Sequence, residues 1–164
     1  MSDTAFKTDR FYSPTKGRMS FEEVISDIVR IMESDPEAPY LIVVGSDSHS
    51  SVGEVDFVSA IIIHRLGKGG RYFWRRIRES KIHTLRQKIY REATLSFELA
   101  KGLMEELEER TPLDYDLEIH VDVGERGKTK DLIDEVVGMI VGSGFSVKTK
   151  PYAYAASTVA DKHT

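Results

Sequence analysis

The chain contains no cysteine, and it has no long hydrophobic run. Without cysteine there are no disulfides, cysteine nucleophiles or zinc–thiolate sites. No run approaches the roughly 20 apolar residues of a membrane-spanning helix. The first seven residues also lack the apolar middle of a signal peptide. We therefore expect a cytoplasmic protein that has no membrane partner.

The composition itself is that of a globular domain. The chain has 164 residues, of which 40% are apolar and 30% are charged. A chain of this length buries roughly 70% of its unfolded surface, so its core needs no disulfide or structural metal. This predicts a single domain over residues 1–164, with an N-terminal arm and helix over 1–39 and a core over 40–164.

Basic residues are concentrated in one part of a chain whose net charge is −4. Ten Lys or Arg lie between Arg65 and Arg91, where Glu79 is the only acid. This segregation indicates a site for a polyanion, although Arg stems can also cover apolar surface on a solvated face. By charge and position, four side chains are candidate phosphate contacts: Arg75, Arg76, Lys128 and Lys130.

Hydrophobic periodicity and capping signals predict helices separated by strands. One helix follows a capping box at Ser20, and a longer one runs from Thr84 to Pro112. A third begins at Thr129 and a short fourth covers 153–161, whereas residues 1–18 are expected to form an arm or loop. Strands are expected over 40–44, 55–65, 72–78, 117–121 and 145–150.

The order of these elements predicts an α/β fold. The first three strands follow one another through short glycine-containing turns, which is typical of an antiparallel meander. The fourth and fifth strands each follow a helix, so right-handed crossovers make them parallel to their neighbours. We expect a mixed five-stranded sheet of order 3-2-1-4-5, flanked by helices on both faces, with an N-terminal helical extension.

Two aspartates follow strands that this order makes neighbours. Asp47 ends the first strand and Asp122 ends the fourth. Open α/β sheets bind ligands at such an edge, and two carboxylates brought together there share a proton or bind a cation. Each aspartate taken alone could equally be a turn residue at a strand exit.

The long helix offers a third carboxylate. Helical geometry places Glu92 about 70° from the direction of the apolar stripe and Glu98 about 170° from it, so Glu92 is preferred. Glu92 could instead pair with Lys88 or Arg91 on the surface. Asp161, with His163 as a rival, could complete the set if the last helix folds back. Four side chains are thus candidate catalytic and metal-binding residues: Asp47, Glu92, Asp122 and Asp161.

Such a set suits two Mg²⁺ or Mn²⁺ ions, because these hard cations prefer oxygen ligands. Two ions roughly 4 Å apart would hold the attacking and leaving oxygens of a phosphodiester. The chemistry predicted from this set is therefore metal-dependent hydrolysis of a nucleic-acid backbone.

Several segments also resemble a known family: Gly45–His49, His64–Gly69, Ile119–Gly124, Gly127–Lys130 and Lys150–Ser157. On these segments the chain resembles the ribonuclease H-like superfamily and, more closely, the uncharacterised bacterial YkuK family. The resemblance implies a ribonuclease H-like fold that acts on RNA, DNA or a hybrid with Mg²⁺ or Mn²⁺. It assigns the metal ligands to Asp47, Glu92 and Asp122, with Asp161 or His163 as the fourth.

Two alternatives remain. Residues 122–129 nearly match a phosphate-binding loop, but an aspartate replaces its first glycine, so a nucleotide-binding phosphotransferase-like protein is less favoured. A non-catalytic nucleic-acid-binding module is also possible, because aromatic residues interleave the basic stretch. Strand alternation would put Trp74 and Arg76 on one face, and Phe73 and Arg75 on the other.

Overall fold

The computed structural model describes residues 10–121 and 130–148. Within these ranges there are three helices, α1 (Phe21–Ser34), α2 (Leu85–Arg110) and α3 (Lys130–Gly142). The strands of the same ranges are β1 (Phe11–Ser13), β2 (Gly17–Met19), β3 (Tyr40–Ser51), β4 (Glu54–Arg65), β5 (Gly69–Glu79), β6 (Asp116–Val121) and β7 (Ser146–Lys148).

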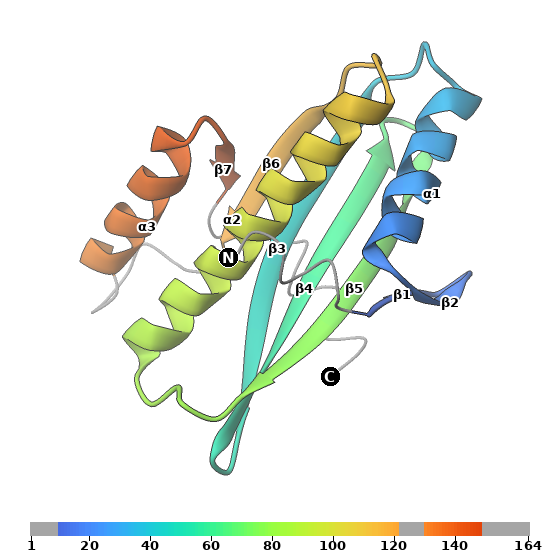
Figure 1. The fold of residues 1–164 in the computed structure, drawn as a ribbon. Coiled ribbons are helices and arrows are strands. Elements are labelled where there is room, and N and C mark those ends of the chain that lie inside the picture. Colours follow the sequence, from blue (N-terminus) through green and yellow to red (C-terminus); the bar gives the residue numbers. More distant parts are fainter. Residues whose placement is uncertain (1–9, 122–129, 149–164) are drawn as a thin grey trace.

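The strands form one mixed sheet of order β2-β1-β5-β4-β3-β6-β7 (Figure 1). Strands β3, β4 and β5 pair antiparallel, whereas β6 pairs parallel with both β3 and β7. The predicted order 3-2-1-4-5 is therefore confirmed for the five strands from β5 to β7. Parallel pairing next to β3 comes from the crossover through α2, which carries the chain from β5 past β4 and β3 to β6.

The N-terminal segment corrects one prediction. Residues 1–18 were expected to form an arm or loop, but residues 11–19 form the β1–β2 hairpin and extend the sheet beyond β5, so the sheet has seven strands. Tyr12 pairs with Trp74 of β5, and Gly17 adopts a positive φ of 69° that favours glycine. Strands of three residues are too short to show a period-two pattern in the sequence.

Both long helices begin at the predicted capping boxes. The hydroxyl of Ser20 accepts the backbone N–H of Glu23 (3.1 Å), and the Glu23 carboxylate accepts the backbone N–H of Ser20 (2.9 Å). Thr84 and Gln87 make the same reciprocal pair at the start of α2. These bonds satisfy N–H groups that the first turn of a helix leaves without helical partners.

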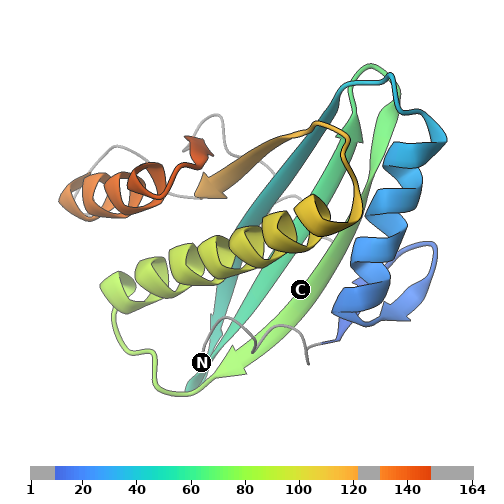
Figure 2. The ribbon, with the colours of Figure 1, turned by 45° about the horizontal axis from the view of Figure 1, so that its top comes forward.

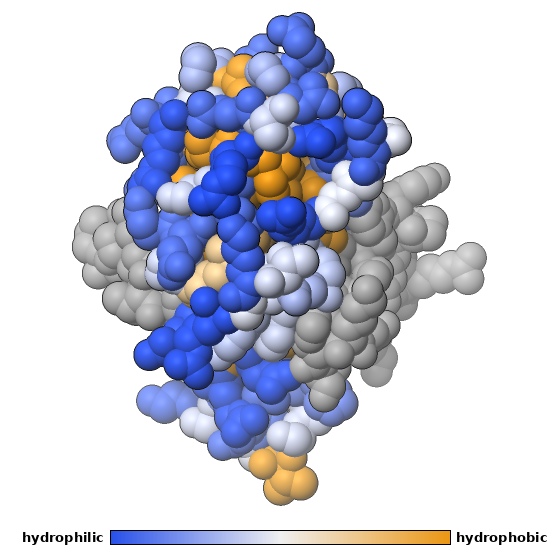
Figure 3. Space-filling model, turned by 90° about the vertical axis from the view of Figure 1, so that its right-hand side faces the viewer, coloured by the Kyte–Doolittle hydropathy of each residue, from blue (hydrophilic) through white to orange (hydrophobic). Residues whose placement is uncertain are grey.

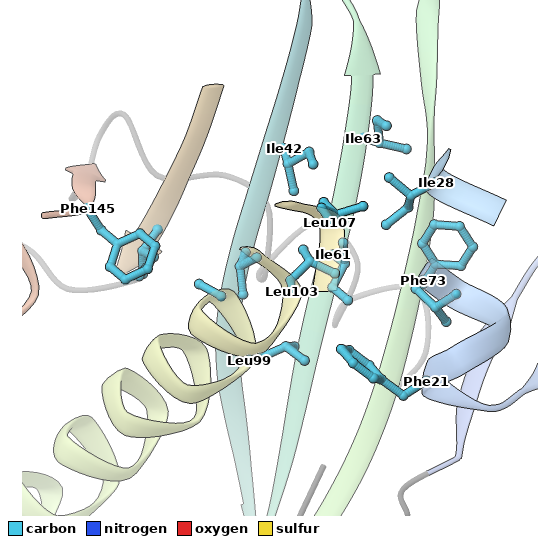
Figure 4. Close-up of a cluster of buried hydrophobic side chains, with 14 of the residues drawn as sticks. Phe21, Ile28, Ile42, Ile61, Ile63, Phe73, Leu99, Leu103, Leu107 and Phe145 are labelled. Carbon is cyan, nitrogen blue, oxygen red and sulfur yellow. The ribbon is translucent and has the colours of Figure 1, made fainter. Parts of the chain in front are cut away.

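Helices α1 and α2 pack side by side on one face of the sheet (Figure 2). The core between these helices and the sheet contains large buried side chains from both, including Ile61, Phe73, Ile28, Leu99 and Leu103 (Figure 4). Helix α3 adds buried apolar side chains to the same cluster. Hydrophilic side chains cover most of the side formed by α1 and the β1–β2 end of the sheet, around a smaller hydrophobic area (Figure 3).

Of the helices predicted for the two faces of the sheet, the three that the structure describes, α1, α2 and α3, lie on the same face. The crossovers through α2 and α3 run in the same direction along the sheet, and right-handed crossovers of this kind share a face. The helix expected over 153–161 lies outside the described residues.

A buried carboxylate joins α1 to the sheet. The side chain of Asp27 is 1% exposed and binds Lys16 (2.8 Å), Arg30 (2.8 Å) and Arg71 (3.1 Å). Burial by itself raises the pKa of Asp27, but hydrogen bonds and charges from Lys16 and Arg71 outweigh it and hold the pKa below the ordinary value. This ion cluster connects α1 to the β1–β2 turn and to β5.

We expect Asp27→Asn to lower the free energy of unfolding by about 2 kcal/mol, because three cations lose their shared acceptor. The depressed pKa stabilises the fold above the ordinary value of 3.8, and this contribution is lost as the pH falls through the folded-state pKa. Urea unfolding at pH 7 and at pH 3 measures both effects. Glu33→Gln, an exposed site on α1, is the matched control. Equal stability of the two variants at pH 7 would contradict this role for Asp27.

Candidate functional site

Asp47 lies inside a long strand and does not end it. Strand β3 continues to Ser51 and pairs with β4 through the turn at Gly53, whose φ is +75°. The parallel pairing with β6 stops earlier, at Ser46 and Val121. Asp47 is therefore the first residue of β3 beyond the described β6 pairing, and its half-buried carboxylate accepts the backbone N–H of Ser48 (2.9 Å).

The residues on either side of Asp47 both contact α2. The Ser96 hydroxyl donates to the Ser46 hydroxyl (2.8 Å), and the Ser48 hydroxyl donates to the Glu92 carboxylate. Successive side chains of a strand point to opposite faces, so Asp47 projects away from α2. We call the sheet face that points away from α2 the Asp47 face.

The structure therefore does not bring Asp47 and Glu92 together. Glu92 is buried, with 7% of its surface exposed, on the side of the sheet that α2 covers. This arrangement does not support the prediction that Glu92 shares a cation with Asp47. Among the residues that the structure describes, no group of three acidic or histidine side chains could hold a metal ion.

Helix α2 and strand β3 are joined by a row of polar contacts, which we call the serine ladder. Its rungs are Ser46 with Ser96, Ser48 with Glu92, and Ser50 with Lys88, whose ammonium donates across 3.1 Å. A two-residue step along a strand rises about 6.7 Å, and a four-residue step along a helix rises about 6 Å, so successive rungs stay in register.

The innermost rung of the serine ladder is extended onto β4. The hydroxyls of Ser46 and Ser59 are 2.8 Å apart, and Ser46, Ser59 and Ser96 are each at most 2% exposed. The sequence carries a signal for this arrangement in the serines at alternate positions of β3. The serines can be recognised as a row of contacts only when they are aligned with polar residues that recur every four positions on α2.

The Glu92 side chain faces the sheet, in agreement with its predicted position on the helix. Its predicted surface partners make other contacts: Lys88 donates to Ser50, and Arg91 donates to Glu79 across 2.7 Å. Glu98, which the helical phase places toward solvent, is only partly exposed.

The basic stretch is divided between the two faces of β5. Arg76 is exposed on the Asp47 face, in line with Asp47 through the register pairs Asp47–Val58 and Val58–Arg76. Two strand spacings of roughly 4.8 Å separate these backbone positions by about 10 Å. Arg78 on the same face donates to Asp56 (2.8 Å), and this hydrogen bond lowers the pKa of Asp56.

Arg75 was expected to contact phosphate, but the structure places it inside. It is 2% exposed on the α2 side of the sheet, and its guanidinium lies 5.7 Å from the centre of the Phe11 ring. Strand alternation accounts for the difference, because adjacent arginines in a strand must point in opposite directions. A buried guanidinium does not reach a phosphate backbone, so Arg75 supports packing in this fold.

Beside Arg76 lies a hollow with aromatic and basic walls. The rings of Tyr12 and Trp74 stack with centroids 4.8 Å apart and planes 29° apart. The Arg76 guanidinium lies 5.9 Å from the Trp74 ring. The hollow measures about 450 Å³ and is lined by Arg10, Tyr12, Trp74, Arg76 and Arg78.

A buried histidine lies on β6, the strand beside β3. His120 is 2% exposed, pairs with Gly45 of β3, and its Nε2 is 3.1 Å from a carboxylate oxygen of Glu118. Burial lowers the pKa of His120, although Glu118 opposes the effect, so the ring stays neutral at pH 7.

The remaining predicted site residues fall elsewhere in the chain. Four of them lie outside the described residues: Asp122, Lys128, Asp161 and His163. Lys130 is the first residue of α3, and only its backbone is described. Asp122 directly follows Val121, the β6 residue that pairs with Ser46.

Comparison with known proteins assigns the chain to a family. A family model described as Ribonuclease H-like matches residues 23–164. The chain belongs to the ribonuclease H-like family. It is also 32% identical over 168 residues to the uncharacterised protein YkuK of Bacillus subtilis (strain 168), across 94% of this chain and 96% of that protein. No solved structure matches the chain.

Within the described ranges, none of the helices of this ribonuclease H-like chain combines the length and the hydropathy that crossing a bilayer requires.

We expect Ser46→Ala to lower the free energy of unfolding by about 1–2 kcal/mol, because it leaves the buried Ser59 and Ser96 hydroxyls short of a partner. Ser51→Ala, at the exposed end of the same strand, should change it by less than about 0.5 kcal/mol. Urea unfolding followed by circular dichroism makes the comparison. If the two variants unfold at the same urea concentration, the serine ladder does not stabilise the contact between α2 and β3.

Proposed function

We propose that this ribonuclease H-like protein binds nucleic acid on the Asp47 face and cleaves the phosphodiester backbone there. The observation that carries the proposal is that Asp47 and the exposed Arg76 project from the same face in one row of the sheet. An arginine attracts the phosphate backbone, and a carboxylate about 10 Å away lies within the reach of neighbouring nucleotides.

Family membership supports the nucleic-acid part of the proposal. The ribonuclease H-like match covers residues 23–164, which include Asp47 and the whole basic stretch. A fold by itself does not fix an activity, so the proposal depends on the side chains of the Asp47 face. The arginines that line the hollow on this face, Arg10, Arg76 and Arg78, agree with a polyanionic ligand, although the net charge of the chain is −4.

Divalent cations remain a prediction within this proposal. Mg²⁺ and Mn²⁺ prefer carboxylate oxygen, and Asp47 offers one on the proposed binding face. Val121 of β6 pairs with Ser46 of β3. Asp122 directly follows Val121 in the sequence, and Asp47 directly follows Ser46. This matched position in the sequence supports the prediction that the two aspartates act together. Glu92 lies on the opposite side of the sheet and is not part of the proposed centre.

A second candidate is a nucleic-acid-binding module without catalysis. The stacked aromatic pair beside Arg76 favours it, because such a surface binds nucleic acid without needing a metal. The nucleotide-binding alternative depends on residues 122–129, which lie outside the described ranges.

We expect Asp47→Asn to reduce cleavage of labelled RNA, DNA or hybrid in Mn²⁺ or Mg²⁺ by on the order of 100-fold. Glu92→Gln should leave cleavage within about twofold of the parent, because the amide oxygen still accepts from Ser48 and the side chain faces away from Asp47. The measurement is the initial cleavage rate, with EDTA as the metal-free control.

The outcomes separate the candidates. An equal loss in both variants would contradict the separation of Glu92 from the reaction centre. Salt-sensitive binding with no cleavage by the parent, under any of these metal conditions, would favour the non-catalytic module.

A further inference from the structure

The aromatic pair of the Asp47 face joins two parts of the sheet that are far apart in sequence. Tyr12 lies in the N-terminal hairpin, and its register partner Trp74 lies in the middle of β5. Both residues are half-buried, so part of each ring faces the hollow beside them. Because the pair is stacked, the two rings present one rigid aromatic surface.

Cations surround this aromatic surface. Arg10 and Arg76 are exposed and line the same hollow. Arg78 also lines it, and its guanidinium binds Asp56 and Glu54. Arg10 and Arg76 each lie two residues along the chain from a ring of the pair, so we take these two arginines as the phosphate contacts. The Arg76 guanidinium is 5.9 Å from the Trp74 ring, near the outer limit of a cation–π contact, so little attraction is lost if a base enters between them.

An aromatic surface between arginines distinguishes forms of nucleic acid. Bases in a duplex already stack on one another, whereas an unpaired base can stack on a protein ring while its flanking phosphates bind cations. Stacking accepts any base because every base has a π-face. The combination therefore fits an unpaired strand better than a duplex.

We propose that Tyr12 and Trp74 form a stacking site for an unpaired base, and that Arg10 and Arg76 bind its flanking phosphates. This makes single-stranded nucleic acid, or an unpaired end or loop, the ligand of this face. The inference rests on the nucleic-acid-binding part of the proposed function and not on cleavage at Asp47.

Trp74 is the only tryptophan of the chain, so its fluorescence reports directly on the site. The full-length protein is titrated in EDTA with a 20-nucleotide oligothymidine, an oligouridine, and a hairpin duplex of similar length. We expect both single strands to quench the tryptophan emission and to bind about tenfold more tightly than the duplex.

Variants are compared by the fluorescence anisotropy of the labelled oligothymidine. Tyr12→Leu and Trp74→Leu should each weaken binding about tenfold, whereas Trp74→Phe keeps an aromatic ring and should bind within about threefold of the parent. Arg76→Gln should reduce the slope of log affinity against log salt by about 0.7. Lys101→Gln removes the same charge from the exposed side of α2 and should leave the slope unchanged. Thermal melts establish that each variant is folded.

Three results would overturn the inference. If single strands bind, but neither leucine variant weakens their binding and the tryptophan emission does not change, the stacking site is wrong and the proposed function stands. Duplex binding as tight as that of single strands would overturn the choice of ligand. If none of the three nucleic acids binds, both the inference and the proposed function fail.

Discussion

Strand β3 has two faces with different partners, and this alternation governs the rest of the structure. One side of β3 carries apolar residues such as Ile42 and Val44, which lie in the core cluster, and then the serines of the serine ladder, which bind α2. A shift of one residue would bury Asp47 against α2 and turn these serines outward. The contacts of Ser46 and Ser48 therefore fix the direction of Asp47 without touching its carboxylate.

Strand alternation also divides the arginines of the basic stretch between the two faces of β5. Arg71 contributes to the ion cluster around Asp27, and Arg75 lies over the Phe11 ring, both on the helix side of β5. Arg76 and Arg78 emerge on the Asp47 face. A high linear density of arginine thus produces a smaller basic surface than the count suggests, and part of the charge stabilises the N-terminal hairpin and α1.

The core topology could be predicted because its signals are long and local. The apolar run of β3, the β-branched run of β4 and the capping boxes at Ser20 and Thr84 each act over neighbouring residues, and handedness rules convert their order into a sheet. The β1–β2 hairpin lacks such a signal. It depends on the pairing of Tyr12 with Trp74, a contact between residues more than 60 positions apart, and no local pattern encodes it.

The candidate site was harder to predict because it depends on how the helical period of α2 is aligned with the two-residue alternation of β3. A helical wheel correctly turns Glu92 toward the sheet, but it does not tell which residue of β3 lies opposite. That depends on where the strand ends, and β3 continues past Asp47 because β4 offers hydrogen-bonding partners as far as Ser51. Once the strand continues, Ser48 takes the position facing Glu92, and Asp47 joins the surface of Trp74 and Arg76. The residues best placed to act with Asp47 are therefore those of the face opposite α2, whichever chemistry that face supports.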